Sequence, residues 1–237
     1  MKERGMIFNG EMTRAILDGR KTQTRRIMKV QPSEDLTPMN MALETDYKAR
    51  WYTPGIVDKN GYLQPSTKEV FGVADENEGY SCPFGAVGDR IWVREAFRVH
   101  SLATDVATLV YKASERNSWT EQTHRVPVAV CNKPATPEKW TPSLHMPRWA
   151  SRILLEITDV RVERLNAISE EDARAEGIID GGCLNCGEPE PCGCANPEPD
   201  ATDAFAYLWQ SIYGQENWNS NPWVWVIEFR IVASGGD

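Results

Sequence analysis

A short basic segment near the start of the chain has the side chains best suited to bind phosphate groups. It reads Gly19-Arg20-Lys21-Thr22-Gln23-Thr24-Arg25-Arg26, and with Lys29 it places five positive charges within ten residues. Guanidinium and ammonium groups clustered in this way bind the phosphates of nucleic acids. The alternative is a solvated basic edge with no ligand, since basic runs are common on protein surfaces. We predict Arg20, Arg25 and Arg26 as nucleic-acid-binding residues and leave this alternative open.

Further along the chain, other side chains could extend the same surface. Arg94, Arg98, Arg148 and Arg152 are additional cations, and Trp149 lies between the last two. An indole ring beside guanidinium groups is typical of sites where a base stacks on an aromatic side chain. Trp149 could equally pack in the core or cover one end of a barrel. We therefore predict Arg94, Arg148, Trp149 and Arg152 as further nucleic-acid-binding residues.

Four of the six cysteines fall within twelve residues, with the spacing Cys-x2-Cys-x5-Cys-x-Cys. They are Cys183, Cys186, Cys192 and Cys194, in a loop rich in glycine and proline. Four thiolates close together, with glycines that let the backbone wrap, suit a tetrahedral structural zinc site. The loop has few apolar residues, so metal binding would supply its folding free energy. We predict one zinc ion held by these four residues; unliganded thiols, disulfides and an iron–sulfur cluster are the alternatives.

The charge of the chain is unevenly distributed, and this bears on the class of partner. The net charge is −8, but no Lys or Arg occurs from Ala175 to Phe229, a stretch that contains nine acidic residues. Residues 1–174 hold 25 of the 26 basic and 24 of the 34 acidic residues, a balance of +1. A basic face for nucleic acid therefore remains open on the first three quarters of the chain.

Several functional classes can be set aside from the sequence. No apolar run approaches the roughly 20 residues that a membrane span needs. The charged N-terminus, Met1 to Met6, is not followed by the apolar stretch of a secretory signal. We therefore expect a cytoplasmic protein with no membrane partner. The three histidines, His100, His124 and His145, share no metal-site or triad spacing, and we assign them no role.

Periodicity and turn residues predict the helices and strands that carry these residues. We predict helices near residues 11–18, ending before Gly19, and over residues 169–176 and 204–213. Strands are predicted over Arg90 to Val99, Ile153 to Leu165 and Pro222 to Val232. Helices and strands do not alternate regularly, so an α+β sheet or small barrel is favoured over a parallel doubly wound sheet. We expect one domain over residues 1–237, with irregular insertions at about 30–88 and 113–143 and the Cys-rich loop at about 180–200.

The order of these motifs resembles the ASCH domain family of the PUA-like superfamily. Small bacterial ASCH proteins have a similar Gly-x-Lys-Thr-x-Thr-x-Arg run after their first helix. The turn into the strand at Gly88 to Val93, the helix ending Ala175-Glu176-Gly177 and the closing strand around Val226-Ile227-Glu228-Phe229 are similar to later family elements. The long insertions resemble those of phage- and prophage-encoded ASCH proteins. The resemblance implies a small mixed β-barrel with flanking helices.

The resemblance also implies a function in RNA or nucleoside chemistry. Some small ASCH proteins are amidohydrolases that remove acetyl from acetylcytidine, and the matching catalytic residues here are Lys21, Thr24 and Glu176. Positions 21 and 24 point to opposite faces of an ideal strand, so their side chains meet only if the segment turns or bulges. We expect a protein that binds or processes RNA or a modified nucleoside, with hydrolysis of an acylated cytidine as the reaction. A noncatalytic nucleic-acid-binding accessory protein of a phage or prophage is the alternative.

Overall fold

The computed structural model describes residues 1–179 and 201–234. The four clustered cysteines, Cys183, Cys186, Cys192 and Cys194, lie outside the described residues, so the zinc site stays a prediction. The chain divides into two compact units. Unit 1 comprises Met1–Thr22, Gly88–Glu156 and Phe229–Asp237, and unit 2 comprises Gln23–Val87 and Ile157–Glu228.

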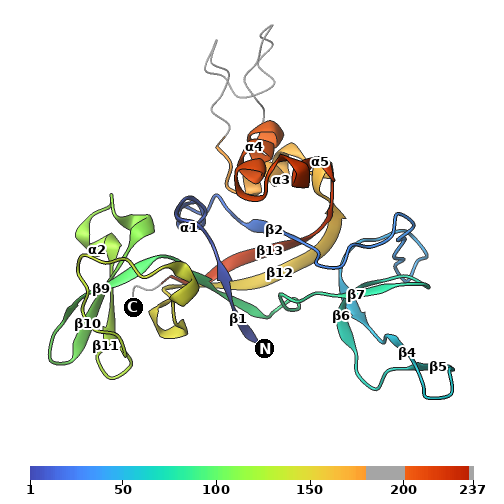
Figure 1. The fold of residues 1–237 in the computed structure, drawn as a ribbon, viewed down its shortest axis with the longest axis horizontal. Coiled ribbons are helices and arrows are strands. Elements are labelled where there is room, and N and C mark those ends of the chain that lie inside the picture. Colours follow the sequence, from blue (N-terminus) through green and yellow to red (C-terminus); the bar gives the residue numbers. More distant parts are fainter. Residues whose placement is uncertain (180–200, 235–237) are drawn as a thin grey trace, which may run out of the picture. The chain divides into compact units, whose positions relative to one another are not determined.

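The largest sheet is open and has five strands (Figure 1). Its order is β1 (Glu3–Ile7), β8 (Arg90–Arg94), β12 (Ile153–Arg164), β13 (Trp223–Ser234) and β2 (Gln23–Ile27). Apolar side chains recur at every second position of the first half of β12, where Ile153, Leu155 and Ile157 are buried. Alternation of this kind gives a strand one face that packs against a core. β2, which carries Arg25 and Arg26 of the basic segment, is at one edge of this sheet.

Unit 1 also contains a three-stranded sheet that is separate from the five-stranded sheet. Its order is β11 (Thr123–Pro127), β10 (Val106–Tyr111) and β9 (Phe97–Leu102). The helical elements of this unit are α1 (Gly10–Leu17), α2 (Trp119–Gln122) and the 3-10 turns η1 (Lys112–Ser114), η2 (Ser143–His145) and η3 (Arg148–Ala150). The buried ring of Tyr111 lies in the core cluster with Phe97 and Met146, and its hydroxyl donates to the Ala150 carbonyl at 2.8 Å. That bond satisfies a buried polar group that would otherwise be costly.

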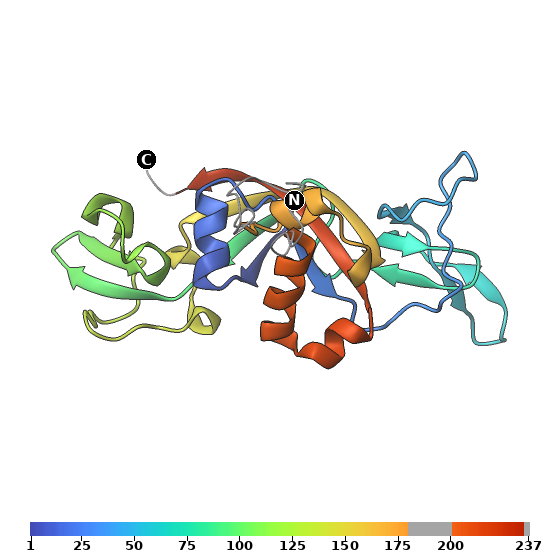
Figure 2. The ribbon, with the colours of Figure 1, turned by 90° about the horizontal axis from the view of Figure 1, so that it is seen from above.

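Unit 2 holds the short strands of residues 30–88 and a group of helices. A three-stranded sheet has the order β3 (Arg50–Tyr52), β6 (Val70–Ala74) and β7 (Gly79–Ser81), and β4 (Gly55–Val57) pairs with β5 (Leu63–Pro65). The helical elements are η4 (Leu165–Ala167), α3 (Glu170–Ala175), α4 (Ala201–Tyr213) and α5 (Gln215–Asn219); the three α-helices lie together in both views (Figures 1 and 2). Phe205 and Trp209 of α4 pack with Val224 and Val226 of β13. This packing covers one face of the strand pair β13–β2.

The α+β class is confirmed, and most predicted elements are present. The predicted closing strand lies in the same sheet as the predicted strand over Ile153 to Leu165, as β13 next to β12. One prediction is wrong in detail: Arg90 to Val99 is not one strand but two, β8 and β9, in different sheets. The break falls at Glu95, whose carboxylate is buried against Arg152. Among the described residues, no helix combines the length and apolar character needed to cross a membrane.

Candidate functional site

The basic segment begins where α1 ends. The side chain of Asn9 caps the helix by accepting the Met12 N–H at 2.8 Å. At the other end Gly19 has φ +74°, a left-handed conformation that glycine adopts at little cost. The N–H groups of Arg20 and Lys21 both donate to the Ala15 carbonyl at 2.9 Å. The helix therefore ends as its glycine predicts, and the chain turns into the segment that leads to β2.

Polar side chains are buried at unusual density in this segment. Lys21, Gln23, Thr24 and Arg25 are each no more than 2% exposed, and Glu176 is 5% exposed. Lys, Arg and Glu are rarely buried unless they are paired, because removing their charge from water is costly. Such burial indicates either a structural ion-pair network or a functional site. Lys21 belongs to unit 1, and Gln23, Thr24, Arg25 and Glu176 belong to unit 2.

Arg25 is the centre of a buried ion-pair network in unit 2. Its Nε donates to Glu163 Oε1 at 2.8 Å, and its Nη2 contacts the same oxygen and lies 2.9 Å from Asp172 Oδ2. Its Nη1 lies 3.2 Å from Glu176 Oε1. The guanidinium also lies over the Phe205 ring, 5.8 Å from its centroid. One guanidinium thus joins β2 to β12, to α3 and to the residue after α3.

Arg161 of β12 extends the network. It donates to Asp172 Oδ2 at 2.9 Å and to Glu163 Oε2 at 3.4 Å, and it also contacts Glu228 of β13. Burial acts to raise the pKa of the Asp172 carboxyl, but the charges of Arg25 and Arg161 outweigh it and hold that pKa below its ordinary value. Asp172 therefore stays ionised and binds two guanidinium groups.

The pairing of β2 with β13 shows which side chains share a face. Arg25 is opposite Val226 and Thr24 is opposite Ile227, in a continuous antiparallel register. Val226 packs with the helices of unit 2, so Arg25 projects from the helix-covered face of the strand pair. Because successive side chains of a strand alternate, Thr24 projects from the other face. Arg25 and Glu176 are brought together, whereas Thr24 belongs to the opposite face of β2.

The predicted nucleic-acid-binding residues of the basic segment have different surroundings. Arg20 is exposed and donates to Asp18 Oδ2 at 3.0 Å. Arg26 is half-buried and is opposite Trp225 of β13. The side chain of Arg25 has no exposed surface, and its bonds go to carboxylates. This placement gives no support to a phosphate-binding role for Arg25, which instead connects strands to a helix.

The other predicted nucleic-acid-binding residues lie in unit 1. Arg94 donates to the Leu144 carbonyl, and Arg148 donates to Glu3 Oε2 at 2.8 Å. Trp149 packs edge-on against Phe97, with ring centroids 6.2 Å apart, which favours the core-packing alternative. Arg152 is buried and binds both Glu95 oxygens, at 2.9 and 3.0 Å. Arg152 is buried, as Arg25 is, and its hydrogen bonds to Glu95 indicate a structural role.

Sequence reasoning missed the acidic half of both buried networks. No sequence pattern singled out Asp172 as a functional residue. Its N–H does donate to Ser169 Oγ at 3.1 Å, but its carboxylate binds arginines. Arg25 and Arg26 lie in β2 opposite Val226 and Trp225 of β13, so two charged residues adjoin a largely apolar strand. Charges that enter a core need opposite charges nearby.

Within residues 1–179 and 201–234, no group of three or more His, Cys, Asp or Glu side chains is arranged to hold a metal ion. The zinc prediction rests on Cys183, Cys186, Cys192 and Cys194, which fall outside these ranges.

Comparisons of the chain with models of protein families, with curated protein sequences and with solved structures find no match.

Proposed function

We propose that this chain is an ASCH-type protein that binds or processes RNA or a modified nucleoside, and that its reaction is hydrolysis of an acylated cytidine. The observation that carries the proposal is the burial of Lys21, Thr24 and Glu176, each at least 95% removed from solvent. These are the three residues that the family resemblance singles out. Functional sites concentrate ionisable and nucleophilic groups in buried positions, as structural ion-pair networks also do. The PUA-like fold family and the structural zinc ion belong to the same proposal, although the five-stranded sheet is open.

The reaction assigns one role to each residue. The Thr24 hydroxyl attacks the acyl carbonyl while Lys21, as a neutral amine, takes its proton. The C–N bond breaks as the proton that Lys21 took from Thr24 passes, by way of the Glu176 carboxylate, to the departing cytosine amine. Water then hydrolyses the acyl-threonine, which releases acetate and restores the hydroxyl. Arg25 holds Glu176 through the 3.2 Å contact between Nη1 and Oε1.

One observation favours the noncatalytic alternative. Strand alternation places Thr24 on the face of β2 opposite to Arg25, the residue that contacts Glu176. A binding protein does not require those groups to meet. In that case the exposed cations of the segment, such as Arg20 and Lys29, would contact the phosphates of the RNA.

Acetate release from N4-acetylcytidine separates the two functions. The unmutated chain should release acetate, and Lys21→Ala should lower turnover by several powers of ten, as loss of a member of a catalytic unit does. Thr24→Val should have the same effect, and Arg230→Gln, an exposed change elsewhere in the chain, should have none. Circular dichroism would show that each variant is folded. Absence of turnover by the unmutated chain contradicts the hydrolase.

RNA binding tests the alternative in the same preparation. A binder without turnover should lose affinity as salt rises, because phosphate contacts release counterions. Lys29→Gln should then weaken binding modestly for every RNA sequence and reduce the salt slope by about one ion. A chain that neither releases acetate nor binds RNA would contradict both functions.

A further inference from the structure

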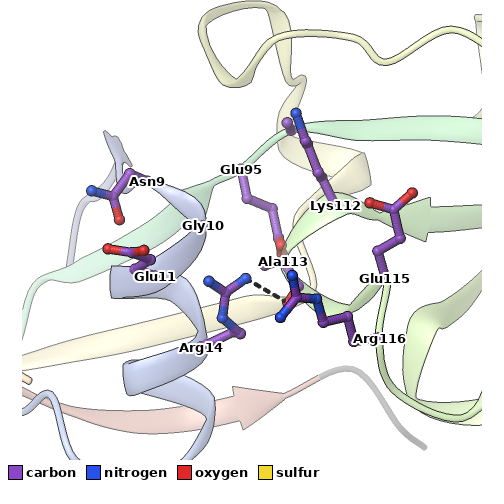
Figure 3. A pocket seen from close by; sticks show the side chains of 10 residues that line it. Asn9, Gly10, Glu11, Arg14, Glu95, Lys112, Ala113, Glu115 and Arg116 are labelled. Atoms are coloured by element: carbon purple, nitrogen blue, oxygen red, sulfur yellow. Dashed lines mark hydrogen bonds between the residues drawn. The ribbon is translucent and has the colours of Figure 1, made fainter. Parts of the chain in front are cut away.

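Unit 1 contains a cavity of about 580 Å³ that no part of the proposed function uses (Figure 3). It lies where α1 faces the turn after β8 and the residues that follow β10. Six ionisable side chains line it: Arg14, Lys112, Arg116, Glu11, Glu95 and Glu115. A cavity of this size is in the range that binds drug-sized or nucleotide-sized ligands.

Two guanidinium groups point to one place in this cavity. Figure 3 shows the side chains of Arg14 and Arg116 directed toward Ala113 from opposite sides. Arg14 Nη1 donates to the Ala113 carbonyl at 3.3 Å, which uses one of the five N–H donors of that guanidinium. Among the residues that the structure describes, neither arginine forms an ion pair. Like charges that converge without a carboxylate repel one another, and an anion between them would relieve this repulsion.

The acidic residues of the cavity do not supply that anion. The Glu95 carboxylate points toward the same place, but both its oxygens are bound by Arg152, at 2.9 and 3.0 Å. The carboxylates of Glu11 and Glu115 point away from the two guanidinium groups (Figure 3). The positive charge of Arg14 and Arg116 is therefore not compensated where it is concentrated.

We propose that this cavity binds a phosphate monoester of about nucleotide size, with Arg14 and Arg116 gripping the phosphate. Guanidinium groups bind phosphate oxygens through paired, charge-assisted hydrogen bonds. The volume exceeds what a single phosphate ion fills, so the ester group occupies the remainder, next to Asn9 and Ala96. The site goes beyond the proposed hydrolase or RNA-binding function and does not depend on Lys21, Thr24 or Glu176.

Calorimetric titration of the intact chain with cytidine 5′-monophosphate, inorganic phosphate and cytidine tests the proposal. The nucleotide should bind, and inorganic phosphate should bind more weakly because it fills only part of the cavity. Cytidine should bind at least tenfold more weakly than the nucleotide, because it lacks the charged group. Equal affinities for nucleotide and cytidine, equal affinities for nucleotide and phosphate, or no binding of the nucleotide would each overturn the proposal.

Variants assign the binding to this cavity. Arg14→Gln with Arg116→Gln should weaken nucleotide binding at least tenfold, since each lost charged hydrogen bond is worth about that factor. Both residues are exposed, and glutamine is a good helix former at position 14 in α1, so the fold should persist. Arg125→Gln, an exposed change in β11 of the same unit, should leave binding unchanged. If the double variant fails to fold, the two single variants replace it. Unchanged affinity in folded variants would overturn the site, whatever the outcome of the acetate assay.

Discussion

Arg25 and Glu176 are 151 residues apart in the chain, yet Arg25 Nη1 lies 3.2 Å from Glu176 Oε1. The same guanidinium binds Glu163 and Asp172, so its three carboxylate partners come from β12, from α3 and from the residue that follows α3. A residue that joins three parts of the chain in this way is hard to replace. Its partners are buried or half-buried, and two of them, Glu163 and Asp172, are also bound by Arg161.

Arg25→Met should therefore lower the free energy of unfolding by about 3–5 kcal/mol, because it removes the guanidinium that three buried or half-buried carboxylates share. Denaturant unfolding measures this change. Arg230→Met removes an arginine of similar length from an exposed pair with Glu156 and should cost about 1 kcal/mol or less. Similar losses for the two variants would contradict a structural role for the buried network.

The lowered pKa of Asp172 predicts how stability depends on pH. A carboxyl whose pKa is lower in the folded than in the unfolded chain stabilises the fold above its unfolded pKa, and this contribution is lost as pH falls through the folded value. Asp172→Asn should thus be destabilised at neutral pH, and its difference from the unmutated chain should shrink below the ordinary aspartate value of 3.8. Urea unfolding at a series of pH values measures this.

Asp105→Asn is the matched control for that experiment. Asp105 is exposed and lies in unit 1, whereas the Arg25 network belongs to unit 2. Its replacement should shift stability little at any pH. A pH-independent loss in Asp172→Asn would show that packing of the side chain matters and that its charge does not.

The buried pair Glu95–Arg152 should behave differently when one or both partners are removed. Burial raises the pKa of Glu95 although the charge of Arg152 opposes this. Arg152→Met should cost about 3–5 kcal/mol, because Glu95 is then buried alone. The double change Glu95→Leu with Arg152→Met should cost clearly less than the single one. Additive losses in a double-mutant cycle would mean that the two side chains are not coupled.

Elemental analysis of the purified chain tests the zinc prediction. One zinc ion per chain is expected, and Cys183→Ser with Cys186→Ser should abolish it, since two of the four ligands are lost. Cys131→Ser lies outside the cluster and should retain the metal. Equal zinc content in the cluster variant and the unmutated chain, or none in either, would contradict the site.

The sequence predicts local elements well and the charged interior poorly. The helix that ends before Gly19 is marked by its own cap residues, and β12 and β13 by apolar alternation or apolar runs. The break between β8 and β9 was not predicted; it falls at Glu95, whose partner Arg152 is 57 residues away in the sequence. The acidic partners of Arg25 are likewise distant in sequence. Which opposite charges meet is decided by strand order, and no local pattern encodes that order.

Gly19 has a consequence for chirality. Its φ of +74° is unfavourable for an L-residue, yet a side-chain carbon built at this position would meet no other atom within 4 Å. Position 19 therefore has space for a side chain, but its backbone conformation disfavours any L-residue. An L-alanine would cost about 1 kcal/mol through its backbone alone. The mirror-image residue, D-alanine, favours this conformation, and in a semisynthetic chain it would stabilise the end of α1 by restricting the unfolded backbone.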